Sequence, residues 1–370
     1  MSAHNKGNPE KPHIIGGMFG LEIEIRENSA SAVARPQILT GLHLRLITAR
    51  SAFTLLARAL RPANVWLPSY LCGVVIDAFV ASGSCLHFYS VCEDLQISDD
   101  GWVAKVQTGD MVVFIDYFGF NAWNPYGKQA KERGAWVVED ACQAMLNYRF
   151  SEYADYVIAS PRKFIGVPDG GILFAQYGAA LPSVHLPPPP PEWWLDALKA
   201  SQLRAEFDRH GGDRQWFELF RTTDPNGPTE PSRMSELSSL LLDHAIDYDG
   251  IATSRRRNFS QLSAALPEFA MFRELSDDAV PLGFPVRVLN RDHVRRGLFE
   301  CEIYPPVHWP ILHIVPEEFQ ASHRLAQNIL TLPCDQRCSS EEIERLIQIL
   351  QSLHPEPVNS PRTIVPTADL

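Results

Sequence analysis

Short, almost uninterrupted apolar runs recur through the first half of the chain, and they narrow the folds that it can adopt. MVVFIDYFG at 111–119, AWVVED at 135–140, ADYVIAS at 154–160 and GGILFA at 170–175 each hold few polar residues. Strands that are buried on both faces of a parallel sheet have this composition. Helix-like segments separate several of the runs, among them GVVIDAFVAS at 73–82 and PYGKQAKERG at 125–134. The alternation predicts an α/β fold, a three-layer αβα domain around a mainly parallel sheet.

A proline run divides the chain. LPPPPPEWW at 186–194 contains five consecutive prolines, which can join neither a sheet ladder nor a helix interior. We predict a stiff polyproline II connector over 186–191, with a ligand for an SH3-type domain as the alternative. The predicted parts are a disordered leader at 1–15, a large α/β domain at 16–225 that includes the connector, a smaller C-terminal α+β domain at 226–355 and a loose tail at 356–370.

Local patterns predict further elements. GLEIEI at 20–25 alternates as a short strand does, and residues 233–266 have the pattern of two helices or one long bent helix. PLGFPVRVL at 281–289 and FECEIYPPVHWP at 299–310 predict strands of the smaller domain. Residues 321–353 predict two helical segments, the second of which begins at an SSEE sequence.

Composition excludes several classes of partner. The formal net charge of -11 argues against nucleic acid or an anionic membrane as the main partner. The seven cysteines form no CxxC pair and fit reduced thiols in a cytoplasm. His308 and His313 lack an acidic neighbour at ligand spacing, so we expect no bound metal. No apolar stretch reaches about 18 residues and no apolar signal region is present, which predicts a soluble cytoplasmic protein.

The segment from Trp136 to Phe174 carries the strongest chemical signal. Asp140 ends an apolar run, Gln143 follows it, Lys163 lies 23 residues beyond Asp140, and Gly170-Gly171 opens the next run. A pyridoxal phosphate (PLP) site requires a carboxylate that keeps the pyridine nitrogen protonated and a lysine that holds the aldehyde as an imine. The Gln143 amide could meet the ring hydroxyl beside that imine. The alternatives to a PLP site are that Asp140 only caps the following helix and that Lys163 is an ordinary surface lysine.

A PLP site must also hold a phosphate. Arg50, Ser51 and Ala52 begin a helical segment whose backbone N–H groups, Ser51 hydroxyl and Arg50 charge could cradle an anion. A plain serine cap explains the same residues. Ser160, three residues before Lys163, is a second candidate partner of the phosphate or the lysine. The SRRRN sequence at 254–258 indicates a solvated helix face, or alternatively a contact with an anionic substrate tail.

These blocks together resemble the DegT/DnrJ/EryC1/StrS family of sugar aminotransferases, which are PLP enzymes of fold type I. TARSAFTLLARAL, VVEDACQA, SPRKFIGVPDGG, RMSELSSLLLDHAI and IYPPVHWP are similar to its successive motifs, and the likeness extends over roughly residues 45–355. The resemblance implies that Lys163 is the imine lysine and proton shuttle, and that Asp140 pairs with the pyridine nitrogen. It implies phosphate contacts at Ser51 and Ala52. It also implies a homodimer with sites at the interface.

The chain departs from the family pattern at defined positions. Cys72 stands where the family has an aromatic ring that stacks on the cofactor, and Tyr70 is the candidate substitute. Pro231 replaces an asparagine that reaches the partner subunit's cofactor. Tyr304 and His308, in the block similar to the C-terminal signature, are candidate substrate contacts. The departures indicate a divergent member.

The resemblance implies transfer of an amino group from a glutamate-like donor to a keto-sugar or related ketone, as in nucleotide-sugar biosynthesis. Two alternatives stay open. One is a PLP-dependent lyase or dehydratase on the same scaffold. The other is a catalytically degenerate PLP-binding protein with a regulatory or partner role.

Overall fold

The computed structural model describes residues 14–22, 35–99, 101–121 and 123–358. The expected leader and tail therefore lie almost wholly outside the described residues. At the start of the described part, Ile15 is 1% exposed and pairs with Ile303 in a two-stranded parallel sheet. The described chain is thus already fixed to the fold at residue 15.

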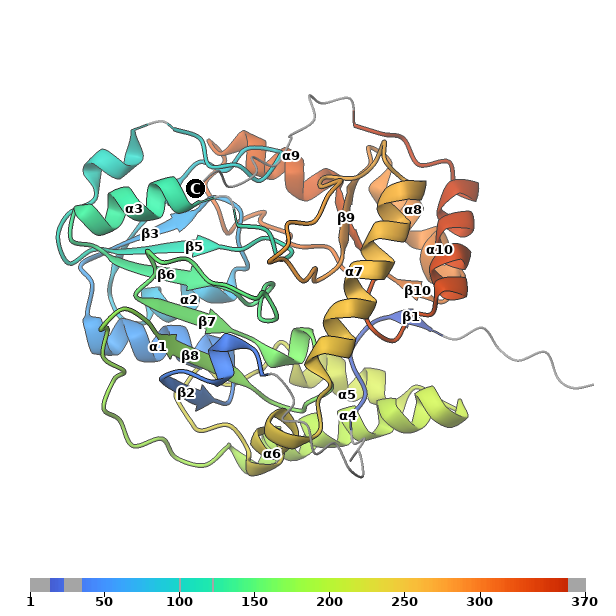
Figure 1. Ribbon diagram of the computed structural model, residues 1–370, viewed down its shortest axis with the longest axis horizontal. Coiled ribbons are helices and arrows are strands. Elements are labelled where there is room, and N and C mark those ends of the chain that lie inside the picture. The colour runs from blue at the N-terminus through green and yellow to red at the C-terminus, as the bar shows by residue number, and fades with distance from the viewer. Residues whose placement is uncertain (1–13, 23–34, 100, 122, 359–370) are drawn as a thin grey trace, which may run out of the picture.

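A seven-stranded sheet forms the centre of the first half of the chain (Figure 1). Its strands are β2 (His43–Leu46), β3 (Asn64–Pro68), β4 (Cys85–Tyr89), β5 (Met111–Ile115), β6 (Trp136–Asp140), β7 (Tyr156–Ala159) and β8 (Gly171–Ala175). The strand order is β2-β8-β7-β6-β5-β3-β4, and only the β2–β8 and β7–β8 pairs are antiparallel. The mainly parallel sheet predicted from the apolar runs is confirmed.

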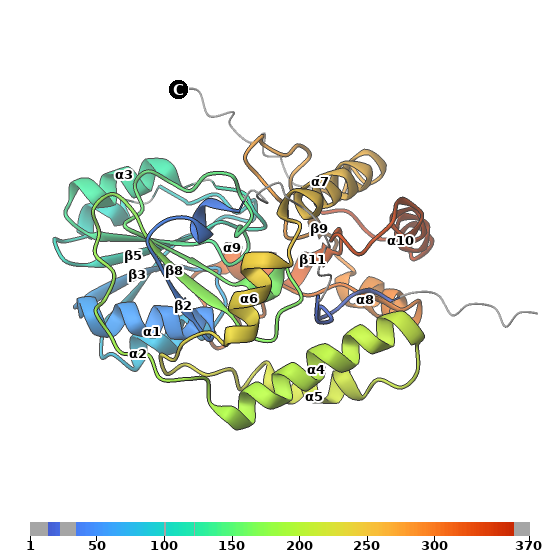
Figure 2. The same ribbon diagram turned by 60° about the horizontal axis from the view of Figure 1, so that its bottom comes forward.

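Helices cover both faces of this sheet. α1 (Ala49–Leu60) and α2 (Val74–Val80) pack on one face, and α3 (Asn124–Glu132) packs on the other, as Figure 2 shows. Every residue of β5 and of β8 is buried, because each of these strands is covered from both sides. The expected three-layer αβα architecture is therefore present.

The proline run leads directly into a helical hairpin. Pro191 is the first residue of α4 (Pro191–His210), a position where a missing N–H costs nothing and the fixed φ suits a helix. The connector predicted to end at residue 191 thus ends one residue earlier. α4 packs on α5 (Gln215–Thr223), and the two helices lie side by side in Figure 2.

The rest of the chain contributes helices α6 (Glu236–His244), α7 (Tyr248–Ala265), α8 (Arg291–Glu300), α9 (Gln320–Asn328) and α10 (Ser340–Ser352). It also contributes strands β9 (Phe284–Arg287), β10 (Ile303–Tyr304) and β11 (Ile329–Leu332). β9 and β11 form an antiparallel pair, and β10 pairs with β1 (Ile15–Gly16). Residues 233–266 form two helices, α6 and α7, and residues 321–353 contain most of α9, then β11, then the whole of α10.

Two predicted strands need correction. FECEIYPPVHWP yields only the two residues of β10, while Phe299 and Glu300 end α8. Val294 and Leu298, four residues apart and fully buried, hold α8 against its neighbours. GLEIEI forms no strand at Gly20–Glu22, and its remaining residues lie outside the described part of the chain. Leu21 instead donates its N–H to Ser201 of α4 at 2.9 Å, which fixes it beside that helix.

Buried Asp169 links parts of the chain that are distant in sequence. Its side chain accepts from the Ser235 N–H at 2.7 Å, from the Ser235 hydroxyl at 2.5 Å and from the Ser238 hydroxyl at 2.6 Å. It also accepts from Trp194 Nε1 of α4 at 3.3 Å. One carboxylate thus joins the start of β8, the first turn of α6 and α4.

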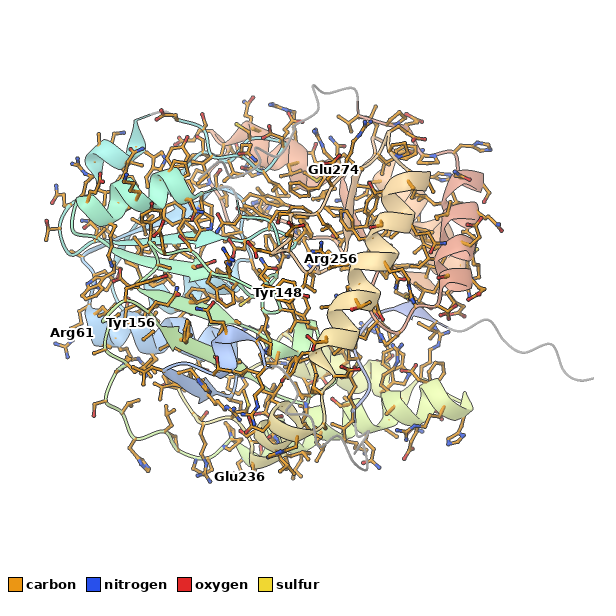
Figure 3. All side chains as sticks on the ribbon, in the orientation of Figure 1. Arg61, Tyr148, Tyr156, Glu236, Arg256 and Glu274 are labelled. Carbon is orange, nitrogen blue, oxygen red and sulfur yellow. The ribbon has the colours of Figure 1, made fainter. Side chains whose placement is uncertain are left out.

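Side chains fill the space between the sheet and α7, where Arg256 is labelled in Figure 3. Arg256 Nη1 donates to the Ser276 carbonyl at 2.9 Å and holds the 276–279 loop against the helix. No described helix has the length and apolar character needed to cross a membrane.

Candidate functional site

A cavity of about 540 Å³ opens at the carboxyl ends of the sheet strands. Strand order reverses between β3 and β5, and in open α/β sheets ligands bind in the crevice at such a point. Cys72, just after β3, and Ile115, at the end of β5, both line the cavity. Segments from the N-terminal strand, the α4–α5 hairpin and the C-terminal part of the chain close the remaining sides.

Asp140 provides a buried carboxylate at the end of β6. It lines the cavity, is 6% exposed, and accepts the Cys142 N–H at 3.0 Å. Burial raises the pKa of this carboxyl, and the Lys163 ammonium opposes that rise. The carboxylate is therefore held where a cationic ring nitrogen would stabilise it.

Lys163 ends a short 3-10 helix, Pro161–Lys163, between β7 and β8. Its Nζ lies 5.9 Å from the centre of the Trp309 ring, and the residue lines the same cavity as Asp140. Its charge also acts on Cys72, Cys142 and His308. The lysine and the strand-end acid, 23 residues apart in sequence, thus meet in one pocket.

Gln143 is held in a single orientation. Its Oε1 accepts the Phe118 N–H at 2.8 Å, while its Nε2 is buried and has no partner among the described residues. A buried amide donor without an acceptor costs about 1–3 kcal/mol. Because Gln143 lines the cavity, a ligand acceptor atom is the natural partner for this donor.

The start of α1 forms another wall. Thr48, Ala49 and Arg50 line the cavity, as residues of a helix N-terminus that can accept an anion. Thr48 forms a capping box with Ser51: Thr48 Oγ1 accepts the Ser51 N–H at 3.1 Å. Arg50 Nη1 donates to the carbonyls of Pro225 at 3.2 Å and Gly227 at 3.3 Å.

Ser51 and Ala52 do not reach the cavity, contrary to the predicted phosphate contacts. Both side chains are fully buried behind its wall, and neither residue lines it. The Ser51 hydroxyl donates to the Thr48 carbonyl at 2.7 Å, and the Ala52 N–H donates to the same carbonyl at 3.4 Å. Of this helix start, Thr48, Ala49 and Arg50 line the cavity, directly before Ser51.

The Gly-Gly pair allows β8 to approach this helix start. A Cβ on Gly171 would lie 2.2 Å from the Thr48 carbonyl carbon, a distance no side chain can adopt. Gly170 has φ +150° and its N–H donates to the Ile47 carbonyl at 2.8 Å. The glycines therefore bring Thr48 close to the loop that carries Lys163.

The predicted ring-stacking group is not in the cavity. Tyr70 is fully buried, packs 5.6 Å from Trp309 and 5.8 Å from Tyr117, and does not line the cavity. Cys72 and Trp309 do line it. Tyr70 therefore supports Trp309 from behind. Trp309 lies 237 positions beyond Cys72, so no local pattern pointed to it.

The remaining candidates lie in the cavity. Ser160, Tyr304 and His308 all line it. His308 Nδ1 is hydrogen-bonded to Thr331 Oγ1 at 2.9 Å, and burial, with Lys163, lowers the pKa of His308 to about 3. The imidazole is therefore neutral. The Tyr304 hydroxyl donates to Glu302 at 2.7 Å and accepts from Arg214 at 2.6 Å.

Arg255 contradicts the solvated-face interpretation of SRRRN. Its side chain is fully buried and lines the cavity. It donates to the Pro281 carbonyl at 3.1 Å, to the Leu282 carbonyl at 3.0 Å and to Gln336 at 3.0 Å. Sequence spacing gave no signal for this, because Arg256 and Arg257 next to it are partly or fully exposed.

A pair of buried acids lies behind Asp140. Asp116, just after β5, accepts Trp123 Nε1 at 2.7 Å, and Glu139 accepts the Ser151 N–H at 2.9 Å. The two carboxyls are hydrogen-bonded to each other. Burial raises the pKa of Asp116 to about 6, and burial with the Asp116 charge raises the pKa of Glu139 far above its usual range. Burial and the neighbouring carboxyl therefore both favour the protonated form of Glu139.

The hydrogen-bond donors and acceptors of the residues that line the cavity match those of PLP. Asp140 supplies the acid for a ring nitrogen, the partnerless Gln143 amide supplies a donor for a ring hydroxyl, and Lys163 supplies the amine. The α1 N-terminus supplies an anion site. Among the described residues, no group of three His, Cys, Asp or Glu side chains is arranged to hold a metal ion.

Comparison with known proteins rests on structure. No family model matches the sequence, and no curated protein matches it. A DegT DnrJ EryC1 StrS aminotransferase from Brucella abortus is 15% identical and superposes with a TM-score of 0.59 over 84% of this chain and 86% of that one. Sugar aminotransferase CalS13 from Micromonospora echinospora is 16% identical, with a TM-score of 0.57 over 84% and 87%. NtdA from Bacillus subtilis, with bound cofactor PMP, is 17% identical, with a TM-score of 0.62 over 85% and 74%.

This chain has their fold. The predicted PLP-dependent transferase fold of type I is confirmed as an architecture. At 15–17% identity the shared fold does not establish a shared reaction. The reaction is therefore inferred from the residues that line the cavity.

Proposed function

We propose that the protein is a PLP-dependent aminotransferase, a divergent member of the DegT/DnrJ/EryC1/StrS family. The observation that carries this proposal is one cavity that combines Lys163, the buried carboxylate of Asp140 and a Gln143 amide without a partner. The shared fold of the B. abortus and M. echinospora aminotransferases supports it.

Each residue has a distinct part in this proposal. When bound, PLP supplies the electron sink that stabilises negative charge on the substrate carbon. Asp140 keeps the ring nitrogen protonated, and Gln143 Nε2 donates to the ring hydroxyl. Thr48, Ala49 and Arg50 would hold the phosphate at the start of α1, and Cys72 lines the same cavity.

Lys163 carries the proton chemistry. Its amine anchors the cofactor and, once released, moves a proton at the reacting carbon. The Trp309 ring 5.9 Å away limits the positions that the amine can reach. Burial and the Lys163 charge lower the pKa of His308 to about 3, so His308 is too weak a base to compete for this proton.

The exchange balances without an outside oxidant or reductant. A glutamate-like donor gives up its amino group, takes its new carbonyl oxygen from one water molecule, and leaves as its 2-oxo acid. A ketone, of the keto-sugar type or related to it, accepts the amino group and releases its carbonyl oxygen as water. We propose glutamate as the donor and a cytoplasmic homodimer as the working form, as the family resemblance implies.

The test is the visible absorption that a lysine-linked PLP gives, followed by the donor half-reaction. Wild-type protein loaded with PLP should show this absorption and should lose it on glutamate addition, with one 2-oxoglutarate released per site. Lys163→Ala should show neither signal, whereas Lys128→Ala, at an exposed lysine of α3, should keep both. An unchanged visible band in Lys163→Ala would exclude Lys163 as the anchoring amine.

The same assay separates the alternatives. A lyase or dehydratase would consume substrate without releasing 2-oxoglutarate. A degenerate binding protein would hold PLP with the lysine-linked absorption but would leave glutamate unchanged.

A further inference from the structure

The peptide that follows Lys163 is held by side chains from distant parts of the chain. Phe164 is fully buried, and its N–H donates to the Pro161 carbonyl at 2.9 Å. Its carbonyl accepts two hydrogen bonds, from Gln336 Nε2 at 2.7 Å and from Arg255 Nη2 at 3.4 Å. Arg255 belongs to α7, and Gln336 lies between β11 and α10. Both donors therefore act on the residue directly beside the lysine of the proposed function.

Arg255 and Gln336 form a closed set of contacts with Phe164. Arg255 Nε donates to Gln336 Oε1 at 3.0 Å, so the two side chains that share the Phe164 carbonyl also fix each other. The guanidinium carbon of Arg255 lies 4.7 Å from the centre of the Phe164 ring. A cation at this distance is attracted to the face of an aromatic ring. The ring and the carbonyl of Phe164 are thus both restrained by the same guanidinium.

A second anchor holds the chain two residues further on. The Gly166 carbonyl accepts the Glu22 N–H at 2.9 Å, and a Cβ on Gly166 would lie 1.8 Å from the Gly20 carbonyl oxygen. Gln336 Nε2 also donates to Glu22 Oε1 at 3.2 Å, so one amide contacts both anchors. The chain after Lys163 is therefore held at residues 164 and 166, while Lys163 itself lines the cavity.

No ion pair explains the buried charge of Arg255. The side chain is fully buried, and its hydrogen bonds go to three backbone carbonyls and one side-chain amide, those of Phe164, Pro281, Leu282 and Gln336. Among the described residues, the nearby carboxylate of Asp335 is paired with Arg337 at 2.9 Å, and none is paired with Arg255. Because a buried cation without a counter-ion costs free energy, packing alone does not account for an arginine here. Its bond to Phe164 indicates a further role beside Lys163.

We propose, on the basis of the aminotransferase function proposed above, that Arg255 and Gln336 are positioning residues for Lys163. They fix the Phe164 peptide and thereby set where the Lys163 amine lies in the cavity. Neither side chain exchanges a proton with the substrate. The amine has two tasks, to anchor the cofactor and to move a proton, and both depend on its position. A displacement of about 1 Å at a reacting group can cost about a hundredfold in rate.

The first test follows the attachment of PLP to the apoprotein. Two variants remove the contacts with the Phe164 carbonyl, Arg255→Met from α7 and Gln336→Leu from the segment before α10. Rapid mixing with PLP gives the first-order rate at which the lysine-linked absorption forms at saturating PLP. We expect this rate to fall at least about tenfold in each variant, because the amine is displaced. The final absorption per site should be unchanged, because Lys163 is still present.

The second test separates proton transfer from donor binding in the PLP-loaded protein. Single-turnover loss of the absorption at increasing glutamate concentration gives the maximal rate and the half-saturating concentration. We expect the maximal rate to fall at least about tenfold in each variant, while the half-saturating concentration changes less than about threefold. A wild-type maximal rate with a raised half-saturating concentration would assign Arg255 and Gln336 to donor binding and overturn the positioning role.

Arg256→Met is the matched control. Arg256 lies on the same helix, does not line the cavity, and donates to the Ser276 carbonyl, so its loss should leave both rates unchanged. Thermal melting checks the fold of each variant, and Gln336→Leu, at a half-buried position, decides the question if Arg255→Met does not fold. Wild-type rates in either folded variant would overturn the positioning role. Absence of the glutamate half-reaction in the wild type would instead overturn the aminotransferase function, so the two failures are distinguishable.

Discussion

The two polar atoms of the Gln143 amide have different roles, one within the fold and one toward the cavity. Its oxygen is used by the Phe118 N–H at 2.8 Å, and its nitrogen is left buried without a partner among the described residues. The fold therefore maintains a buried amide donor that a ligand acceptor in the cavity would satisfy. The oxygen belongs to the scaffold and the nitrogen to the proposed cofactor.

We predict that Gln143→Glu weakens PLP binding about tenfold or more without unfolding the protein. The carboxylate still accepts from Phe118, but it faces the ring hydroxyl as a second acceptor and lacks the donor. Fluorescence titration of the apoprotein with PLP gives the affinity, and thermal melting of the apoprotein checks the fold. Equal PLP affinities of variant and wild type would show that Nε2 does not bind the cofactor.

Asp116 gives a pH prediction whose sign follows from its burial. The pKa of Asp116 is raised from 3.8 to about 6 in the folded chain, so the folded state binds more protons than the unfolded state between these values. Stability from this group is therefore lost as pH rises from about 4 to 6. Asp116→Asn should remove this loss. The melting temperature of the variant, relative to that of wild type, should therefore rise as the pH is raised from 4 to 7. If the melting temperatures of variant and wild type differ by the same amount at every pH in this range, the raised pKa of Asp116 is contradicted.

The sequence was sufficient to predict those site residues that have a recognisable pattern directly beside them along the chain. Asp140, Gln143 and Lys163 follow apolar strands or precede a Gly-Gly pair, and they meet in the cavity as predicted. Arg255 and Trp309 reach the same cavity from distant segments, and their surroundings in sequence are ordinary for a helix face and a loop. Tyr70 lies two residues before Cys72 in sequence, but it is fully buried in the connection between β3 and α2 and does not line the cavity.

At the level of elements, the start of α1 serves both stability and binding. Thr48 caps the helix and its hydroxyl also donates to the Pro228 carbonyl at 2.7 Å. The same turn lines the cavity where we place the phosphate. Loss of the cap should therefore affect the fold and the cofactor together.

We predict that Thr48→Ala lowers the free energy of unfolding by about 1–2 kcal/mol and also weakens PLP affinity. Ser339→Ala, at the similar capping box of α10, is the matched control, because α10 does not line the cavity. It should cost about 1 kcal/mol and leave PLP affinity unchanged. Urea unfolding of both apoproteins and PLP titration measure the two effects. A Thr48→Ala variant with wild-type PLP affinity would place the phosphate elsewhere.

Strands that are covered on both faces of the sheet could be predicted from the sequence. β5, β6, β7 and β8 are covered on both faces, and their continuous apolar runs showed it. α8 was missed because only Val294 and Leu298 anchor it, so its charged sequence gave little periodic signal. The described part of GLEIEI, Gly20–Glu22, forms no strand, and Leu21 is instead bonded to α4, a tertiary contact that no local pattern encodes.

At the scale of the whole molecule, Asp169 joins the sheet to the helices that follow it. We predict that Asp169→Ala lowers the free energy of unfolding by about 3 kcal/mol or more, because it leaves buried donors of Ser235 and Ser238 without an acceptor. Asp77→Ala, at an exposed aspartate of α2, should cost less than about 0.5 kcal/mol. Urea unfolding compares the two. A loss below about 1 kcal/mol in Asp169→Ala would show that α6 and α4 are held by other contacts.

The cavity is assembled from segments far apart along the chain, and this bears on how the protein is made. Gly16, the second residue of β1, and Gly17 line the cavity, and β1 pairs with β10 at Ile303–Tyr304. During translation the first of these residues leaves the ribosome long before the last is synthesised. The finished cavity therefore cannot exist on a nascent chain. On the proposed function, the complete PLP site therefore forms only after the segment from Tyr304 to Asp335 has been synthesised.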